Sequence, residues 1–292
     1  MGRQVMDKDI ISIIHHGHGG ADRIAGALAE KLRAAGFAPV TGGIEGASLI
    51  IVIGGDGSFL RTLRQFDFPA IPFVGVNTGH LGFFQELFEE DIDEFIEKYN
   101  TGRFKRQSYR TVSGCIEYDS GRQTFRALNE IAIKAADSRL AHLDIYIGEN
   151  LISEYHGDGV LISTPAGSTA YNYALGGSIV DPRLDLLQLT PIAPVNTTAY
   201  RSFTSGIALP PGLPVRILIS DSAGSSLAAA TAAGANDEEG VFNEILIATD
   251  GNERRFSGVI HIEAGLSEQS VELLRFKDNE FWTTVKQKLL TP

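Results

Sequence analysis

The sequence contains a single cysteine, Cys115, among its 292 residues. One thiol cannot form a disulfide within the chain, and it excludes zinc or iron–sulfur sites built from several thiolates. A lone cysteine also suits a reducing compartment.

Basic residues and long apolar runs are scarce as well. The 25 Lys and Arg against 36 Asp and Glu give a net charge of -11, which argues against nucleic acid or an anionic membrane as the main partner. The longest bulky apolar run, Leu49–Ile53, is far shorter than the roughly 20 residues of a membrane helix. The N-terminus lacks a signal-peptide apolar region, and Met6 breaks the myristoylation pattern. We therefore expect a cytoplasmic protein that binds neither nucleic acid nor membranes.

The composition is that of an ordinary globular protein, with 43% hydrophobic and 21% charged residues. These values exclude a wholly disordered chain, collagen and a coiled coil. The length predicts about two domains, large enough to fold without a disulfide or metal.

The first part of the chain alternates strand-like and helix-like segments. This alternation, with apolar strands, predicts an α/β domain with a Rossmann-like parallel sheet over residues 1–106. The expected strands are Ile10–Ile14, Leu49–Ile53 and Ile71–Val76; the expected helices carry Ile24, Leu28 and Leu32 up to Gly36, then a short segment after Gly57, then Ile92, Phe95, Ile96 and Tyr99.

From residue 107 the pattern changes to short β-rich segments separated by turns. We predict a mostly β, β-sandwich-like domain over 107–273 and a hairpin that turns at Gly148–Asn150. A mobile loop is expected at Ser222–Gly240. Residues 274–292 are expected to hold a helix, Asp278–Leu290, that packs back on the first domain. The expected strands are Val112–Tyr118, Phe125–Ile133, Leu143–Ile147, Leu151–Tyr155, Val160–Thr164, Val215–Ser220, Glu244–Ala248 and Val259–Glu263.

The strongest local signal is Gly54-Gly55-Asp56-Gly57-Ser58, between a buried strand and a helix. Glycines let the backbone approach a phosphate, and a helix N-terminus favours an anion. A carboxylate here would repel that anion unless it accepts a proton from an attacking hydroxyl or orients a metal. The alternative is that Asp56 only caps a helix that starts near Ser58. The segment matches neither the Walker loop nor the Gly-x-Gly-x-x-Gly motif.

Three further segments are candidates for ligand binding, each with a structural alternative. Gly157–Tyr171 ends in small hydroxyl residues that clear space for a flat ligand, or it forms a tight β-corner. Asn129-Glu130 offers an amide and an acceptor, or it is an exposed edge pair. Asn77–Phe84 follows a strand end, where open α/β sheets bind ligands, although its glycines can equally serve a turn. The run at His15–His18 lacks matching metal ligands and is expected to be a loop.

Taken together, these motifs resemble those of NAD kinases, in the same order and over most of the chain. Gly-Gly-Asp-Gly alone also occurs in diacylglycerol kinases, sphingosine kinases and phosphofructokinases, whereas the stretch from Thr164 to Tyr171 is far more specific. The matching segments are Gly54-Gly-Asp-Gly57, Asn77-x-Gly-x-Leu-Gly-Phe83, Asn129-Glu130, Asp158-Gly, Thr164-Pro-x-Gly-Ser-Thr-Ala-Tyr171 and Asp250-Gly251.

The resemblance implies a kinase that transfers the terminal phosphate of ATP to the 2'-hydroxyl of the adenosine ribose of NAD, making NADP with Mg assisting. It implies that Asp56 is the base or orienting carboxylate, and that the protein is a homo-oligomer, a dimer or a tetramer. The binding residues implied are Asp56, Gly57, Asn129, Glu130, Thr169, Ala170, Tyr171, Asn172, Ala174 and Asp250, with Phe83 on the adenine side and His156 and Asp158 near the nicotinamide half.

The sequence departs from the family pattern at a few positions. Ala166 and Ala174 replace residues that carry hydroxyls in many members, the loop at His15–Gly19 differs, and Ser222–Gly240 resembles an insertion. Two other functions are the alternatives. A diacylglycerol-type lipid kinase shares the glycine turn but would need an apolar or basic membrane-facing surface. A non-catalytic sensor would bind NAD or NADP without turnover.

Overall fold

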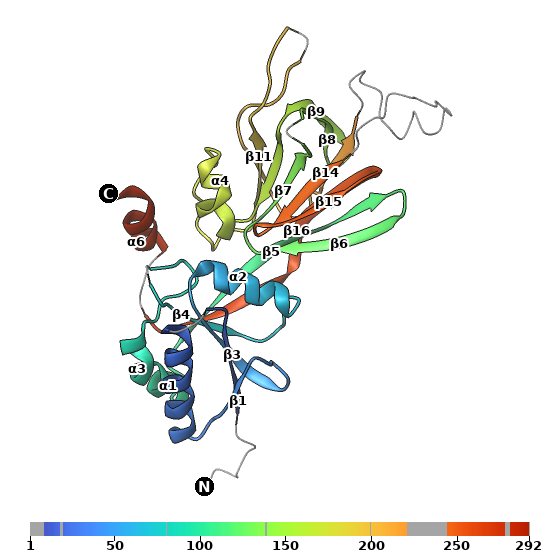
Figure 1. The fold of residues 1–292 in the computed structure, drawn as a ribbon. Coiled ribbons are helices and arrows are strands. Elements are labelled where there is room, and N and C mark those ends of the chain that lie inside the picture. The colour runs from blue at the N-terminus through green and yellow to red at the C-terminus, as the bar shows by residue number, and fades with distance from the viewer. Residues whose placement is uncertain are drawn as a thin grey trace. The chain divides into compact units, whose positions relative to one another are not determined.

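The computed structural model describes residues 9–17, 20–79, 81–137, 139–198, 200–220, 244–277 and 281–291. The chain divides into two compact units, Met1–Tyr109 with Ser270–Pro292, and Arg110–Gln269. Figure 1 gives the order of the elements along the chain. His18, His80 and the loop predicted at Ser222–Gly240 lie outside the described residues.

The first unit contains a parallel sheet, as the sequence predicts. Its strand order is β2-β1-β3-β4-β16, and every one of these pairings is parallel. The strands are β1 (Ile10–His15), β2 (Ala38–Thr41), β3 (Ala47–Ile53), β4 (Phe73–Val76) and the end of the long strand β16 (Val259–Arg275).

Helices cover both faces of this sheet. Alternate residues of β3 pack with α1 (Gly20–Ala34) and α3 (Ile92–Asn100), which lie side by side in Figure 1. On the opposite face, Phe59 of α2 (Asp56–Gln65) packs against Phe73, with ring centroids 5.3 Å apart. A short 3-10 turn, η1 (Glu89–Asp91), precedes α3.

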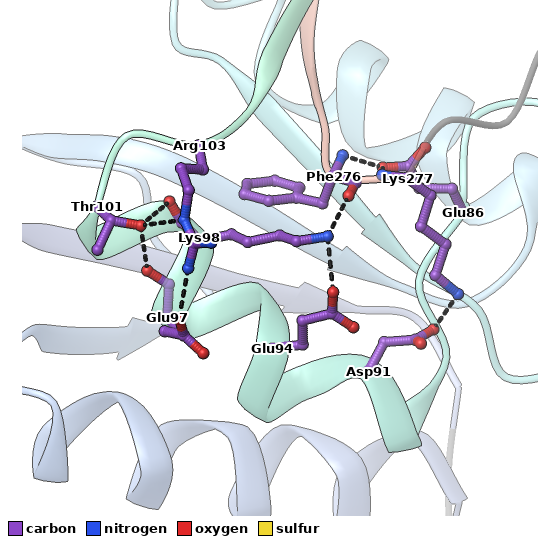
Figure 2. Close-up of polar contacts among 9 residues, drawn as sticks. All are labelled: Glu86, Asp91, Glu94, Glu97, Lys98, Thr101, Arg103, Phe276 and Lys277. Atoms are coloured by element: carbon purple, nitrogen blue, oxygen red, sulfur yellow. Dashed lines mark hydrogen bonds and ion pairs between the residues drawn. The ribbon is translucent and has the colours of Figure 1, made fainter.

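The C-terminal segment belongs to this unit, and its helix packs on it, which confirms the prediction. The described helix is α6 (Phe281–Val285), followed by a π-helical turn, η3 (Lys286–Leu290). Figure 2 shows how the chain is fixed just before it: Lys98 Nζ donates to the carbonyl of Phe276, and the backbone N–H of Phe276 donates to Glu86. The predicted start of the helix at Asp278 lies outside the described residues.

The second unit is mostly antiparallel β, as predicted. One layer runs β16-β13-β8-β9, with β5 paired to β16 and to β6; the other is a six-stranded sheet in the order β12-β11-β10-β7-β14-β15. The first layer holds β5 (Lys105–Tyr118), β6 (Gly121–Ala127), β8 (Ala141–Ile147), β9 (Asn150–Gly157) and β13 (Val215–Ile219). The second holds β7 (Glu130–Ala135), β10 (Gly159–Ser163), β11 (Leu187–Ile192), β12 (Ile207–Leu209), β14 (Ile245–Thr249) and β15 (Asn252–Phe256).

The two layers enclose one apolar core. Ile131 and Ile133 of β7 face it together with Ile145 of β8 and Ile217 of β13. Ala132, between the two β7 isoleucines, lies in a separate small cluster, because successive strand residues point to opposite faces. This arrangement confirms the sandwich-like prediction, and the pairing of β8 with β9 confirms the predicted hairpin.

The prediction of one strand over Phe125–Ile133 is wrong. The segment forms two strands, β6 and β7, interrupted at Leu128 and Asn129. The cause is the carboxylate of Asp250, which accepts the backbone N–H of both residues at 2.9 and 2.7 Å. The N–H groups of these two residues therefore bind a side chain remote in sequence instead of a neighbouring strand.

Among the described residues, no helix is long and apolar enough to cross a membrane. The cytoplasmic location stays a prediction.

Candidate active site

The turn after β3 requires glycine at its first position. Gly54 has φ +146°, and a Cβ on it would lie 2.3 Å from Ser58 Oγ. Its N–H donates to the carbonyl of Val76 at 2.9 Å, which ties the turn to the end of β4. The backbone can then turn directly from the buried strand into α2, whose first residue is Asp56.

Asp56 does not act as the cap of its helix. The N-cap is Gly55, without a side-chain hydrogen bond, so the capping alternative is wrong. Its carboxylate instead accepts two backbone N–H groups of the loop after β4, from Phe83 to Oδ2 and from Phe84 to Oδ1, each at 3.0 Å. These bonds fix the direction of the carboxylate, which remains 26% exposed.

The same loop is held against α2 by further contacts. Gln85 Nε2 donates to the carbonyl of Gly55 at 2.7 Å, and the ring of Phe84 stacks on Phe59 of α2 with centroids 5.0 Å apart. The end of the predicted Asn77–Phe84 segment is thus brought to the Gly-Gly-Asp-Gly turn. Phe83 is part of this contact, whereas Gly57 is exposed on the first turn of α2.

Arg275, at the end of β16, holds the loop from its carbonyl side. Its guanidinium donates to the carbonyls of Phe83 and Phe84 at 3.0 and 3.2 Å, and to Tyr109 Oη at 2.8 Å. A planar guanidinium suits this task because its five donors point in fixed directions. The peptide group between Phe83 and Phe84 is therefore bound on both sides, by Asp56 at its N–H and by Arg275 at its carbonyl.

A small cavity lies beside this loop, under the C-terminal helix. Its volume is ≈ 50 Å³, and its lining includes Phe83, Glu86, Tyr109, Arg275, Phe281 and Thr284. Lys288 Nζ lies 3.3 Å from Asp56 Oδ2 and 4.9 Å from the centroid of the Phe83 ring. The C-terminal segment therefore reaches the turn that carries Asp56.

In the second unit, Asp250 organises the segment that contains Asn129 and Glu130. Asp250 and Gly251 form the turn between β14 and β15, with φ of 46° and 76°. The Asp250 carboxylate accepts the N–H of Leu128 and Asn129, and the N–H of Glu130 at 3.4 Å. The role that this geometry gives Asp250 is to position the backbone of its neighbours.

Asn129 and Glu130 are buried, 6% and 7% exposed, so the edge-pair alternative is wrong. Asn129 Oδ1 and Glu130 Oε2 have no hydrogen-bond partner. Burial, with a smaller contribution from the nearby Asp250 carboxylate, raises the pKa of Glu130 to about 8, against a hydrogen bond from the backbone of Tyr171. Buried polar atoms without partners are costly in native proteins, and a ligand is one way to satisfy them.

The Thr164–Tyr171 segment comes directly against Asn129. Thr164 N–H donates to the Asn129 carbonyl at 2.9 Å, and a Cβ on Gly167 would lie 2.1 Å from that same oxygen. Glycine at 167 is therefore required for the close approach. The segment forms a 3-10 turn, η2 (Ala166–Thr169), and a short helix, α4 (Tyr171–Ala174).

The remaining predicted residues of this segment differ in exposure. Thr169 and Ala170 are half-buried, while Tyr171 and Ala174 are exposed. Asn172 is fully buried. Its Oδ1 accepts a hydrogen bond from Thr190 Oγ1 at 2.6 Å, which ties α4 to β11.

His156 and Asp158 lie at the end of β9 and just after it. The His156 ring stacks on Tyr200 at 3.9 Å, and its backbone N–H donates to Ser202 Oγ at 2.8 Å. Asp158 is exposed between Gly157 and Gly159, and its N–H donates to the Ile192 carbonyl at 3.0 Å.

The described part of the histidine run contacts protein groups. His15, which ends β1, lies 3.2 Å from Asp22, and His16 Nε2 is 2.9 Å from Thr62 Oγ1. Burial lowers the pKa of His16. Within the described residues, no group of three or more His, Cys, Asp or Glu is arranged to hold a metal ion.

Comparison with known proteins gives the family. Residues 42–104 match the family model of the ATP-NAD kinase N-terminal domain, and residues 128–233 match that of the ATP-NAD kinase C-terminal domain. The NAD kinase of Finegoldia magna is 36% identical over 266 residues, which cover 89% of this chain and 90% of that protein. The chain belongs to the NAD kinase family. The predicted enzyme class, a kinase of NAD, is confirmed with it.

Other NAD kinases align over shorter stretches. NAD kinase 1 of Listeria monocytogenes is 34% identical over 56% of this chain and 62% of its own length. An NAD kinase of Staphylococcus aureus is 35% identical over 57% and 63%. The matched part thus spans less than two thirds of each of these two relatives.

Two solved structures share the NAD kinase fold. Yeast NADH kinase, complexed with NADH, has a TM-score of 0.74 at 19% identity, covering 97% of this chain and 87% of that one. An Archaeoglobus fulgidus NAD kinase in complex with ATP has a TM-score of 0.71 at 20% identity, covering 96% and 98%. The predicted fold class is confirmed.

Sequence reasoning missed two charged residues in this NAD kinase family member, Arg275 and Lys288. Arg275 is the last residue of β16, and Lys288 lies in the π-helical turn η3 near another lysine, Lys286. Neither position belongs to a glycine motif, so only the fold reveals that both reach the Asp56 loop.

Proposed function

We propose that this chain transfers the terminal phosphate of ATP to the 2'-hydroxyl of the adenosine ribose of NAD, with Asp56 as the base or orienting carboxylate. The observation that carries the proposal is the carboxylate of Asp56, fixed by two backbone N–H groups at the start of α2. Family membership supplies the reaction class.

The geometry of Asp56 supports that role in a specific way. A carboxylate has about four lone-pair sites, and the two loop N–H groups occupy one on each oxygen. Acceptor capacity therefore remains on a group whose direction is set before substrate arrives. Such preorganisation is the main contribution a protein makes to phosphoryl transfer.

The second unit supplies the proposed dinucleotide contacts. The unpaired Asn129 Oδ1 would accept a hydrogen bond from a hydroxyl or amino group of NAD, and the protonated carboxyl of Glu130 would donate or accept one through its unpaired Oε2. Asp250 would act by fixing the backbone at Asn129, and Asn172 by tying α4 to β11 through Thr190, since their side chains already bind protein groups. The contacts proposed in this unit are Asn129, Glu130, Thr169, Ala170, Tyr171 and Ala174, with His156 and Asp158 near the nicotinamide half. Those proposed in the first unit are Gly57 and Phe83, with Phe83 on the adenine side.

Magnesium fits this site as a partner of the nucleotide. Mg²⁺ typically binds one or two carboxylates together with substrate phosphates and waters, and rarely an all-protein cage. No such cage exists in the described ranges, whereas Asp56 lies at a helix N-terminus suited to phosphate. When bound, the metal would neutralise charge on the transferring phosphoryl group. The proton of the attacking 2'-hydroxyl would then be accepted by Asp56.

A homo-oligomer, dimer or tetramer, is proposed on the family resemblance. Size-exclusion chromatography with light scattering measures the assembly directly. A protein that is monomeric at working concentration would contradict this part of the proposal.

The test of the reaction is an assay with NAD, ATP and Mg²⁺, in which NADP is detected with an NADP-specific dehydrogenase. We expect NADP to form. Phosphorylation of diacylglycerol but not of NAD would support the lipid-kinase alternative, and NAD binding without turnover would support a sensor.

A further inference from the structure

Lys288 and Asp56 are 232 positions apart in the sequence, yet Lys288 Nζ lies 3.3 Å from Asp56 Oδ2. The two side chains are 30% and 26% exposed. The same ammonium group lies over the face of the Phe83 ring, 4.9 Å from its centroid. Lys288 therefore contacts both the carboxylate and the residue whose N–H binds that carboxylate.

The segment that carries Lys288 is anchored before and within its helix. Lys277 donates through Nζ to Asp91 at 2.5 Å, and Glu86 accepts the backbone N–H of Lys277 at 3.3 Å (Figure 2). Val285 is buried, 1% exposed, and the ring of Phe281 lies 6.0 Å from that of Phe83. These contacts fix the position of the helical segment that carries Lys288.

Stability does not account for this contact. An ion pair with both partners partly exposed contributes little to the free energy of folding. What the ammonium group changes is the hydrogen bonding of Asp56. Oδ2 accepts hydrogen bonds from Phe83 N–H and Lys288, which fills its two lone-pair sites. Among the described residues, Oδ1 accepts only the N–H of Phe84.

Gly82 packs closely against Oδ1. A Cβ at position 82 would lie 2.4 Å from this oxygen, so only glycine lets the loop approach it. Oδ1 is thus held close to the loop backbone and keeps one acceptor site, while Oδ2 is occupied.

We propose that Lys288 is a positioning residue for phosphoryl transfer: it occupies Asp56 Oδ2 and so leaves Oδ1 as the oxygen that accepts the hydroxyl proton. This inference rests on the proposed function of Asp56. Lys288 also places a positive charge beside the Asp56 carboxylate. In the proposed reaction this carboxylate lies next to the phosphates of ATP, where positive charge stabilises the transition state.

The test compares three variants of the full chain. Lys288→Met keeps much of the side chain's length but removes the charge and the donors, and Lys288→Arg keeps both. Lys286→Met is the matched control, because Lys286 is exposed in the same helical turn. For each we measure kcat, the KM values for NAD and ATP, and the melting temperature.

For Lys288→Met we expect kcat to fall between about 10-fold and 100-fold, the cost of a misplaced catalytic group. The KM values should stay within about 2-fold, because binding and orientation are separate contributions. The melting temperature should change little. Lys288→Arg should recover most of kcat, and Lys286→Met should match the wild type.

Three results would overturn the inference. One is an unchanged kcat in Lys288→Met, and another is a raised kcat, which would make the contact inhibitory. The third is an equal loss of kcat and melting temperature in Lys288→Met and Lys286→Met, which would make the role structural. A wild-type protein that forms no NADP would instead defeat the proposed function.

Discussion

Gly82 leaves room for the carboxylate of Asp56, since a Cβ at position 82 would lie 2.4 Å from Asp56 Oδ1. We expect Gly82→Ala to displace that carboxylate and lower kcat about 10-fold to 100-fold. The control is Gly26→Ala on α1, where nothing lies within 4 Å of the added methyl group. Steady-state kinetics of both variants measure the effect, and a Gly82→Ala enzyme with normal kcat would show that the close approach is unimportant.

Asp250 offers a test of how the Asn129-Glu130 segment is held. Asp250→Ala removes the acceptor of two buried hydrogen bonds, from the backbone N–H groups of Leu128 and Asn129. It should lower the free energy of unfolding by about 1 to 3 kcal/mol. It should also raise the KM for NAD. Asp250→Asn keeps one oxygen acceptor and tolerates the positive φ of 46°, so it should lose less. Urea denaturation with NAD kinetics would detect both effects, and equal losses in the two variants would argue against the hydrogen bonds as the cause.

Glu130 makes stability depend on pH. Burial, with a smaller contribution from Asp250, raises the pKa of Glu130 from 4.5 to about 8. The folded protein then holds a proton that the unfolded chain releases. The stability that this group contributes is therefore complete below pH 4.5 and is lost as the pH rises toward 8.

The measurement is urea denaturation of wild type and Glu130→Gln between pH 5 and pH 9, without ligand. We expect the wild type to lose stability relative to the variant by up to roughly 1.4 kcal/mol per pH unit within that window, and no further above about pH 8. A difference that stays flat across the window would place the Glu130 carboxyl in a charged, solvated state.

Removal of magnesium separates catalysis from folding. With excess EDTA we expect NADP formation to stop, because the phosphate charge is no longer neutralised. The melting temperature of the ligand-free protein should not change, since the described residues provide no three-residue metal cluster. A drop in melting temperature on chelation would reveal a structural metal.

Local sequence patterns predicted the parts of the fold that depend on local chemistry. The buried run Leu49–Ile53 and the glycine turn after it were sufficient to place a strand and a helix around Asp56. The hairpin at Gly148 followed from alternating residues and a turn.

Long-range contacts were beyond those patterns. The break between β6 and β7 is made by Asp250, more than 100 positions away, so no local pattern could separate the two strands. The same holds for β16, expected to end at Glu263 but continuing to Arg275. In the candidate site, motifs predicted Asp56 and Asn129, whereas Arg275 and Lys288 reach the Asp56 loop through contacts that only the folded chain brings about.

Asp56→Asn replaces the proposed base or orienting carboxylate by a neutral amide. The measurement is the rate of NADP formation at saturating NAD, ATP and Mg²⁺, with NAD affinity determined by calorimetry on the same protein. We predict a rate lower by about 10² to 10⁴ with NAD affinity retained, the loss expected when a general base is removed. Turnover near that of the wild type would show that Asp56 is neither the base nor the orienting carboxylate.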